Sequence, residues 1–213
     1  MNSNNEKKSK GKLNLLMVLG KLLFNPKIKY VDKKVQGRLL KEPCVIICNH
    51  SRMLPFKLSN CDGPMLRYIF KNKNVCSLMA ADLMEKPHFK AVVEGCDCIP
   101  VRRDVASRDW IYKCKEKLES GVSVVIFPEG TTIKEKAVDT FKAGFVMLAN
   151  LANVKVLPVA LNGVYKPFLW KQLKIEIGVP TELNLQKDTS RELKREAQRF
   201  QEIVEKMYLD ITK

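Results

Sequence analysis

Short apolar runs recur along the chain after Pro43, and longer stretches with helical spacing lie between them. The runs are rich in β-branched and other apolar residues and have the length of strands rather than of helices. They predict strands at residues 44–48, 75–80, 98–101, 122–127, 154–161 and 173–179.

The stretches between these runs predict helices near residues 63–72, 82–93, 104–120 and 141–151. Strands that alternate with helices of this length are typical of an α/β fold with a parallel sheet. The continuous apolar run at 122–127 agrees, because a strand of such a sheet is buried on both faces. We therefore predict an α/β fold with a mostly parallel central sheet flanked by helices.

The final segment, residues 190–211, predicts a further helix. Thr189 and Glu192 have the spacing of a capping box at its start. Apolar residues then follow one another at intervals of four and three, which places them on one face that we expect to pack against the sheet. These residues are Leu193, Ala197, Phe200, Val204, Met207 and Ile211.

Residues 13–24 are nearly all apolar and have basic flanks. A helix of this length reaches about 18 Å, short of the roughly 30 Å hydrocarbon core of a bilayer. It would lie in the headgroup interface as an N-terminal amphipathic helical element, or dock on the protein's own core. We favour the interface, and assign residues 1–42 to a basic tail with a membrane-interfacial helix and 43–213 to the α/β domain.

The formal net charge of +15 is compatible with nucleic acid, an anionic membrane surface or a small phosphorylated substrate. Residues 1–43 hold eleven Lys or Arg but three Asp or Glu, next to the apolar stretch. A basic segment beside an apolar one favours the anionic membrane surface. Few aromatic residues lie among these basic residues, so we expect no nucleic-acid partner.

Seven cysteines and two histidines are present, and no two cysteines are separated by two residues. Most of the cysteines lie inside apolar runs, where a free thiol behaves as a small hydrophobic side chain. We therefore expect reduced core cysteines and no metal site.

The first candidate for chemistry is His50, which follows the predicted strand 44–48 directly. Ligands of open α/β sheets bind where strands end, and a histidine there is suited to general-base catalysis. Asp62 is expected at the start of the next helix. It is either a simple helix cap or a carboxylate that orients the imidazole of His50.

Two other strand ends carry polar groups. The segment 127–131, Phe-Pro-Glu-Gly-Thr, follows the buried run 122–127. The segment 95–103 ends in Arg102 and Arg103, and guanidinium groups match phosphate oxygens well.

Taken in this order, these segments resemble the lysophospholipid acyltransferase family, typified by the 1-acyl-glycerol-3-phosphate acyltransferases. The resemblance covers roughly residues 13–180 and depends mainly on Asn49-His50 and on Phe-Pro-Glu-Gly-Thr at 127–131. Val-Leu-Pro-Val at 156–159 and Phe-Lys-Ala-Gly at 141–144 match further segments of the family.

Two features depart from the family pattern. Eleven residues separate His50 from Asp62, where the family usually has four, so we interpret about seven residues as an insertion that loops out before Asp62. Thr132 stands where the family usually has arginine.

The resemblance implies a transfer of a fatty acyl group from an acyl thioester to the hydroxyl of a lysophospholipid. It implies that His50 is the general base and that Asp62 holds its ring. The acceptor would most simply be 1-acyl-sn-glycerol-3-phosphate, which gives phosphatidic acid. The residues implied to bind its phosphate are Arg103 with Glu129, Gly130 and Thr131. At Thr132, either one phosphate ligand is missing or Arg102, Arg103 or Lys142 compensates for it.

The implied donor is acyl-CoA or acyl carrier protein, and the sequence leaves both open. No cofactor is expected. The basic N-terminal segment places the protein at the cytoplasmic face of the cell membrane, as a peripheral or monotopic protein. The alternative is a catalytically silent lipid-binding or scaffold protein of the same fold, which the long spacing between His50 and Asp62 favours.

Overall fold

In the computed structural model of the chain, each of the six apolar runs forms a strand, and a seventh strand precedes them. The structure describes residues 25–33, 41–50, 62–70, 74–90, 93, 96–102, 108–131, 136–162 and 173–213. The strands of this part of the chain are β1 Lys27–Tyr30, β2 Val45–Cys48, β3 Val75–Ala80, β4 Cys98–Val101, β5 Ser123–Ile126, β6 Val156–Asn162 and β7 Lys174–Ile177.

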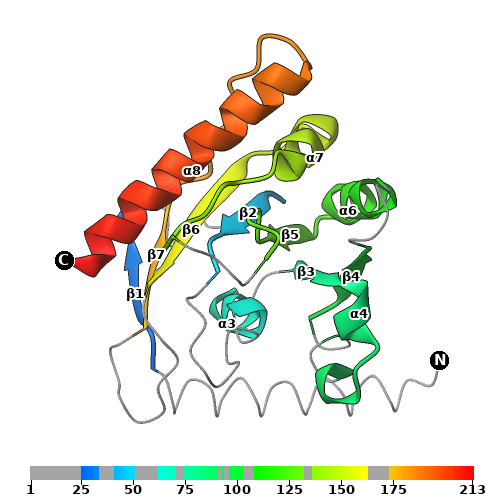
Figure 1. The fold of residues 1–213 in the computed structure, drawn as a ribbon, viewed down its shortest axis with the longest axis horizontal. Helices are drawn as coiled ribbons and strands as arrows, with labels where there is room; N and C mark the ends of the chain where they lie inside the picture. The colour runs from blue at the N-terminus through cyan, green and yellow to red at the C-terminus, as the bar shows by residue number, and fades with distance from the viewer. Residues whose placement is uncertain are drawn as a thin grey trace.

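These strands form one sheet in the order β1-β7-β6-β2-β5-β3-β4 (Figure 1). Neighbours from β6 to β4 are parallel, β7 is antiparallel to β6, and β1 is parallel to β7. The prediction of a mostly parallel α/β sheet is therefore confirmed. Because β2 and β5 are parallel neighbours at its centre, the residues that follow them emerge side by side.

The helices that the structure describes are α3 Asp62–Ile69, α4 Ala81–Met84, the 3₁₀ turn η2 Pro87–Phe89, α6 Asp109–Glu119, α7 Gly144–Ala152 and α8 Ser190–Thr212. The predicted helix at 82–93 is wrong in its extent, because α4 ends at Met84 and Pro87 begins a separate turn. A proline lacks the N–H that a continuing helix needs, and it disfavours helical geometry in the residue before it.

Alternate side chains of the central strand β2 face two different hydrophobic clusters. Val45 and Ile47 pack with side chains of α6, α7 and α8, whereas Ile46 and Cys48 pack with Met65 and other side chains of α3. Figure 1 shows α6, α7 and α8 on one side of the sheet and α3 on the other. The sheet is thus covered on both faces, as its continuous apolar strands require.

Helix α8 carries the predicted apolar stripe, which is buried from Ala197 to Ile211. At its start, one of the two reciprocal hydrogen bonds of the predicted capping box is formed. The N–H of Glu192 donates to Thr189 Oγ1 at 3.3 Å, but the carboxylate of Glu192 accepts from the N–H of Gln186 and pairs with Arg195. The reciprocal bond to the cap residue is replaced by contacts with the preceding loop and the next turn.

Strand β1 lies inside the segment assigned to the N-terminal tail, and the sequence analysis missed it. Its Lys29 forms an ion pair of 2.7 Å with the buried Glu176 of β7. The predicted N-terminal helical element, residues 13–24, lies outside the described residues. Within the described ranges, no helix is both long and apolar enough to cross a membrane.

Candidate active site

The candidate site lies where β2 and β5 end. Ile47 of β2 is paired with Ile126 of β5, so His50 and the Phe-Pro-Glu-Gly-Thr segment leave the sheet next to each other. Asp62, the first residue of α3, lies at the same place, in contact with His50. The residues after β2, at the start of α3 and after β5 therefore meet at the carboxyl ends of two central strands, where α/β sheets bind their ligands.

His50 and Asp62 form a hydrogen bond of 3.1 Å between Nδ1 and Oδ2. The Asp62 side chain is 1% exposed and that of His50 is 15% exposed. The predicted contact is therefore present despite the eleven intervening residues, and this spacing no longer favours a silent protein. A carboxylate at Nδ1 selects the tautomer with the proton on Nδ1, which leaves the lone pair of Nε2 to accept a proton.

The imidazole face is also fixed. The rings of His50 and Phe127 are stacked, with their centroids 4.2 Å apart and 12° between their planes. The sequence analysis assigned no role to Phe127, although it is the first residue of the Phe-Pro-Glu-Gly-Thr segment. Stacking and the bond to Asp62 together restrict the rotation of the imidazole ring.

Glu129 is buried, and its carboxylate faces the backbone. Oε2 accepts the N–H of His50 and Oε1 accepts the N–H of Asp139, both at 2.9 Å. The family resemblance implied that Glu129 is among the groups that bind the acceptor. In the structure its carboxylate connects the backbone after β2 to the loop that leads into α7. Charge-assisted hydrogen bonds are strong, so they hold these two backbone segments in a fixed geometry.

Asn49 is fully buried and acts as a bridge to the neighbouring strand. Its Nδ2 donates to the carbonyl of Leu161 at 2.9 Å, and its Oδ1 accepts the N–H of Leu161 at 2.8 Å. A carboxamide carries both a donor and an acceptor, so it extends the pairing of β2 with β6 beyond the end of β2. This explains why an asparagine precedes His50.

The turn after β5 requires a glycine. Gly130 has a φ of +69°, a conformation that other residues rarely adopt, and a Cβ built on it would lie 2.9 Å from Lys142 Nζ. The N–H of Lys142 donates to the carbonyl of Pro128 at 3.0 Å. The exposed ammonium of Lys142 therefore lies directly over this turn.

The other predicted ligands are less central. Thr131 follows the turn and is half-buried, whereas Arg102 is exposed just after β4. Because β5 and β3 lie between β2 and β4, about 14 Å separates the ends of β2 and β4. Arg103 lies outside the described residues, so its predicted position beside His50 stays a prediction.

The six described cysteines are free. Burial raises the pKa of Cys44 and of Cys76 to about 12, so both remain protonated thiols at neutral pH. This agrees with the predicted role as small core residues. In the part of the chain that the structure describes, no cluster of three or more His, Cys, Asp or Glu side chains is placed to hold a metal ion.

Comparison with known proteins adds three findings. The model of a family described as "Acyltransferase" matches residues 27–162. The chain is also similar to the chloroplastic 1-acyl-sn-glycerol-3-phosphate acyltransferases of Brassica napus and Arabidopsis thaliana, with 29% identity to each over 126 residues. This match covers 58% of the chain and 34% or 33% of the relative, so the chain spans about a third of their length.

Among solved structures, the chain resembles the 1-acyl-sn-glycerophosphate acyltransferase PlsC of Thermotoga maritima. The TM-score is 0.64 with 20% sequence identity, and the match covers 99% of this chain and 84% of the other. At this identity the likeness concerns the fold, and it includes the seven-stranded sheet and its helices.

Proposed function

The chain belongs to the acyltransferase family, and from this premise we propose that it transfers a fatty acyl group from an acyl thioester to the free hydroxyl of 1-acyl-sn-glycerol-3-phosphate. The product is phosphatidic acid. The observation that carries the proposal is the hydrogen bond between His50 and Asp62 at the carboxyl end of β2. The acceptor is supported by the names of both curated relatives, which are 1-acyl-sn-glycerol-3-phosphate acyltransferases.

In the proposed reaction His50 Nε2 removes the proton of the acceptor hydroxyl while its oxygen bonds to the carbonyl carbon of the thioester. The tetrahedral intermediate then breaks its C–S bond, and the leaving thiolate takes the proton from Nε2. Asp62 stabilises the imidazolium between these two steps. No acyl-enzyme is needed, because the acceptor hydroxyl is itself the nucleophile.

Lys142 is the group best placed to bind the acceptor's phosphate. Its ammonium lies over the turn at Gly130, which is two positions before Thr132 in the sequence, and Thr132 replaces the family's usual arginine. The ammonium of lysine is a compact point charge, whereas the planar guanidinium of arginine can form two parallel hydrogen bonds to a phosphate. We therefore expect the contact of Lys142 with the phosphate to depend less on direction. Arg103 and Arg102 remain candidates for a second contact from β4.

We place this reaction at the cytoplasmic face of the cell membrane, with the protein held as a peripheral or monotopic enzyme. The basic flanks of residues 13–24 support attraction to anionic lipid. The donor is acyl-CoA or acyl carrier protein, and the chemistry of the pair requires no cofactor.

A panel of donors and acceptors tests the proposal. The purified full chain is incubated with labelled acyl-CoA or labelled acyl carrier protein, and with lysophosphatidic acid, lysophosphatidylcholine or monoacylglycerol. Mass spectrometry of the lipids should show labelled phosphatidic acid as the main product, and poor use of monoacylglycerol, which lacks a phosphate. Acylation of lysophosphatidylcholine alone would show that the proposed acceptor is wrong. The absence of any acylated product would overturn the whole proposal.

A further inference from the structure

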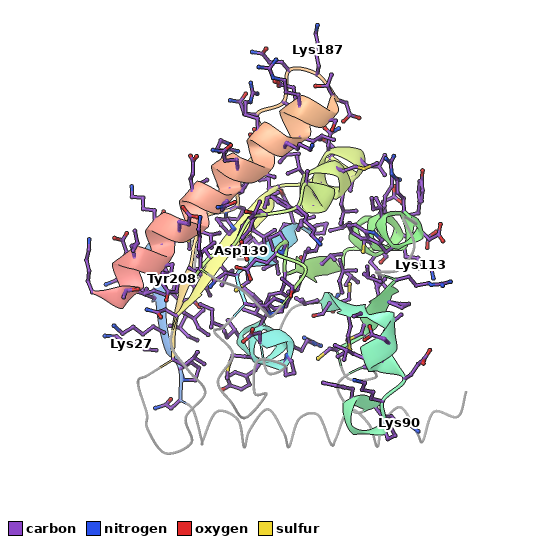
Figure 2. The ribbon with its side chains drawn as sticks, in the orientation of Figure 1. Lys27, Lys90, Lys113, Asp139, Lys187 and Tyr208 are labelled. Atoms are coloured by element: carbon purple, nitrogen blue, oxygen red, sulfur yellow. The ribbon has the colours of Figure 1, made fainter. Side chains whose placement is uncertain are left out.

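The described residues 136–143 form the last part of the connection from the Gly130 turn to α7, and we call them the α7-entry loop. Two of its residues are bonded to side chains at the site. The carbonyl of Ala137 accepts from Asn49 Nδ2 at 3.4 Å, and the N–H of Asp139 donates to Glu129 Oε1 at 2.9 Å. Figure 2 labels Asp139 near the centre of the molecule. The first half of the loop is thus tied to residues that flank His50.

The second half of the loop is held from a distant part of the sequence. The N–H of Phe141 donates to the side-chain oxygen Oε1 of Gln201, in the middle of α8, at 3.1 Å. The next residue is Lys142, whose N–H donates to Pro128 and whose ammonium lies over Gly130. Gln201 therefore fixes the peptide directly before the one that presents the lysine.

The orientation of the Gln201 carboxamide is determined at both ends. Its Nε2 donates to Glu205 Oε1 at 2.8 Å, one turn further along α8, so its oxygen is the atom that faces the loop. Phe141 itself is buried and packs edge-to-face against Phe145, which limits how far its N–H can turn toward water. A loop N–H in this position needs a protein acceptor.

We propose that Gln201 is a positioning residue for the acceptor, which acts through the α7-entry loop on Lys142. The inference depends on the proposed function, since it assigns Lys142 to the phosphate. It reaches beyond the matched family segment 27–162, because α8 lies outside that segment. The C-terminal helix then has a part in substrate binding in addition to covering the sheet.

Three variants of the full chain separate this role from general helix stability. Gln201→Met keeps the length of the side chain but removes the carboxamide. Gln198→Met is the matched control, because Gln198 makes the same type of bond to the residue one turn ahead, Glu202, at 3.2 Å. The double variant Gln201→Glu with Glu205→Gln exchanges donor and acceptor, so it restores an oxygen for Phe141 without a change in net charge.

The first measurement is hydrogen exchange at the Phe141 amide, followed by NMR. Gln201→Met should speed exchange by about tenfold, the effect of about one lost hydrogen bond, while Gln198→Met and the double variant should stay close to the wild type. Unchanged exchange in Gln201→Met would overturn the inference. This readout needs no turnover, so it remains decisive even if the wild-type chain shows no acyl transfer and the proposed function fails.

The second measurement is the kinetics with 1-acyl-sn-glycerol-3-phosphate. Gln201→Met should raise the acceptor KM by about threefold to tenfold with little change in kcat, because the chemistry at His50 is untouched. The double variant should restore the KM. Faster exchange without a higher KM, or an equal rise in KM in Gln198→Met, would show a merely structural role and contradict the proposal.

Discussion

Three neighbours fix three different parts of His50. Asp62 binds the Nδ1 edge, Phe127 covers one ring face, and Glu129 accepts the backbone N–H. The bond to Asp62 favours the tautomer in which Nε2 is the nitrogen that can accept a proton. This arrangement is what a general base needs, because efficient proton transfer depends on geometry before it depends on pKa.

The contribution of Asp62 is tested by Asp62→Asn, which preserves the shape of the side chain and removes its charge. An amide stabilises the imidazolium less and no longer enforces the tautomer with the proton on Nδ1. We expect kcat for acyl transfer to fall by about 10²–10⁴-fold, the range associated with general acid–base catalysis. Circular dichroism should show an unchanged fold, and a kcat close to that of the wild type would remove Asp62 from the mechanism.

The phosphate contact is tested by comparing Lys142→Ala with Arg103→Ala. Each should lower kcat/KM for 1-acyl-sn-glycerol-3-phosphate, by an amount equivalent to about 1.5–3 kcal/mol for a charge-assisted contact. Because Lys142 lies over the turn after β5, its loss should act mainly on the acceptor KM. A large loss in Arg103→Ala with none in Lys142→Ala would place the phosphate at the end of β4 instead.

Only some of the site residues were predictable. His50 and Asp62 carry a motif that places them at a strand end and a helix start, and the structure joins them. Gln201 carries no local signal, since it is one of many polar residues of an amphipathic helix and lies half-buried at the edge of its apolar face. Its contact with Phe141 depends on how α8 crosses the sheet, which sequence periodicity does not encode.

At the scale of whole elements, hydrophobic periodicity predicted the buried strands and α8 well. It failed for β1, whose Lys-Ile-Lys-Tyr sequence is largely exposed and pairs its Lys29 with Glu176 of β7. An edge strand buries little, and its partner is nearly 150 residues away, so neither composition nor local pattern indicates it. It failed in part for 82–93, where Pro87 divides a stretch that otherwise has helical spacing.

The contact between α8 and the loop that precedes it should make the stability of the fold depend on pH. The buried Glu196 accepts the N–H of Asn184 at 2.8 Å and pairs with Arg199 at 2.6 Å. Burial alone would raise the pKa of Glu196, but the bonds from Arg199 and from the N–H of Asn184 outweigh it and bring the pKa below the usual 4.5. Glu196 therefore stabilises the fold fully above about pH 4.5. This stabilisation is lost as the pH falls through the lower pKa that Glu196 has in the folded protein.

Urea unfolding of the wild type and of Glu196→Gln at several pH values measures this effect. At pH 7 the variant should be less stable by about 1–3 kcal/mol, the cost of weakening charged hydrogen bonds in a buried position. The two stabilities should converge in acid, because the wild-type carboxyl becomes neutral there. A difference that is constant from pH 7 to acid would show that the charge of Glu196 is not what stabilises the contact.

Among the residues that the structure describes, lysines are found on several sides of the molecule. Figure 2 shows Lys27, Lys90, Lys113 and Lys187 on different sides of the structure. The dense basic flanks of residues 13–24 remain the best candidate for attachment to anionic lipid.

Deletion of residues 1–25 tests this attachment, and it spares the sheet because β1 begins at Lys27. The shortened chain should stay in the supernatant in flotation with anionic liposomes, whereas the intact chain should float. Raised salt should weaken the binding of the intact chain in part, since screening reduces the ionic attraction but not the burial of apolar residues. If the intact chain fails to float at low salt, residues 13–24 are not a membrane anchor.

His50 is the proposed base in acyl transfer to 1-acyl-sn-glycerol-3-phosphate. The most direct test is the rate of labelled phosphatidic acid formation from a labelled acyl thioester, measured for the wild type, His50→Ala and His88→Ala. We predict product from the wild type and from His88→Ala, and none above background from His50→Ala. Substantial turnover by a correctly folded His50→Ala protein would show that His50 is not the base.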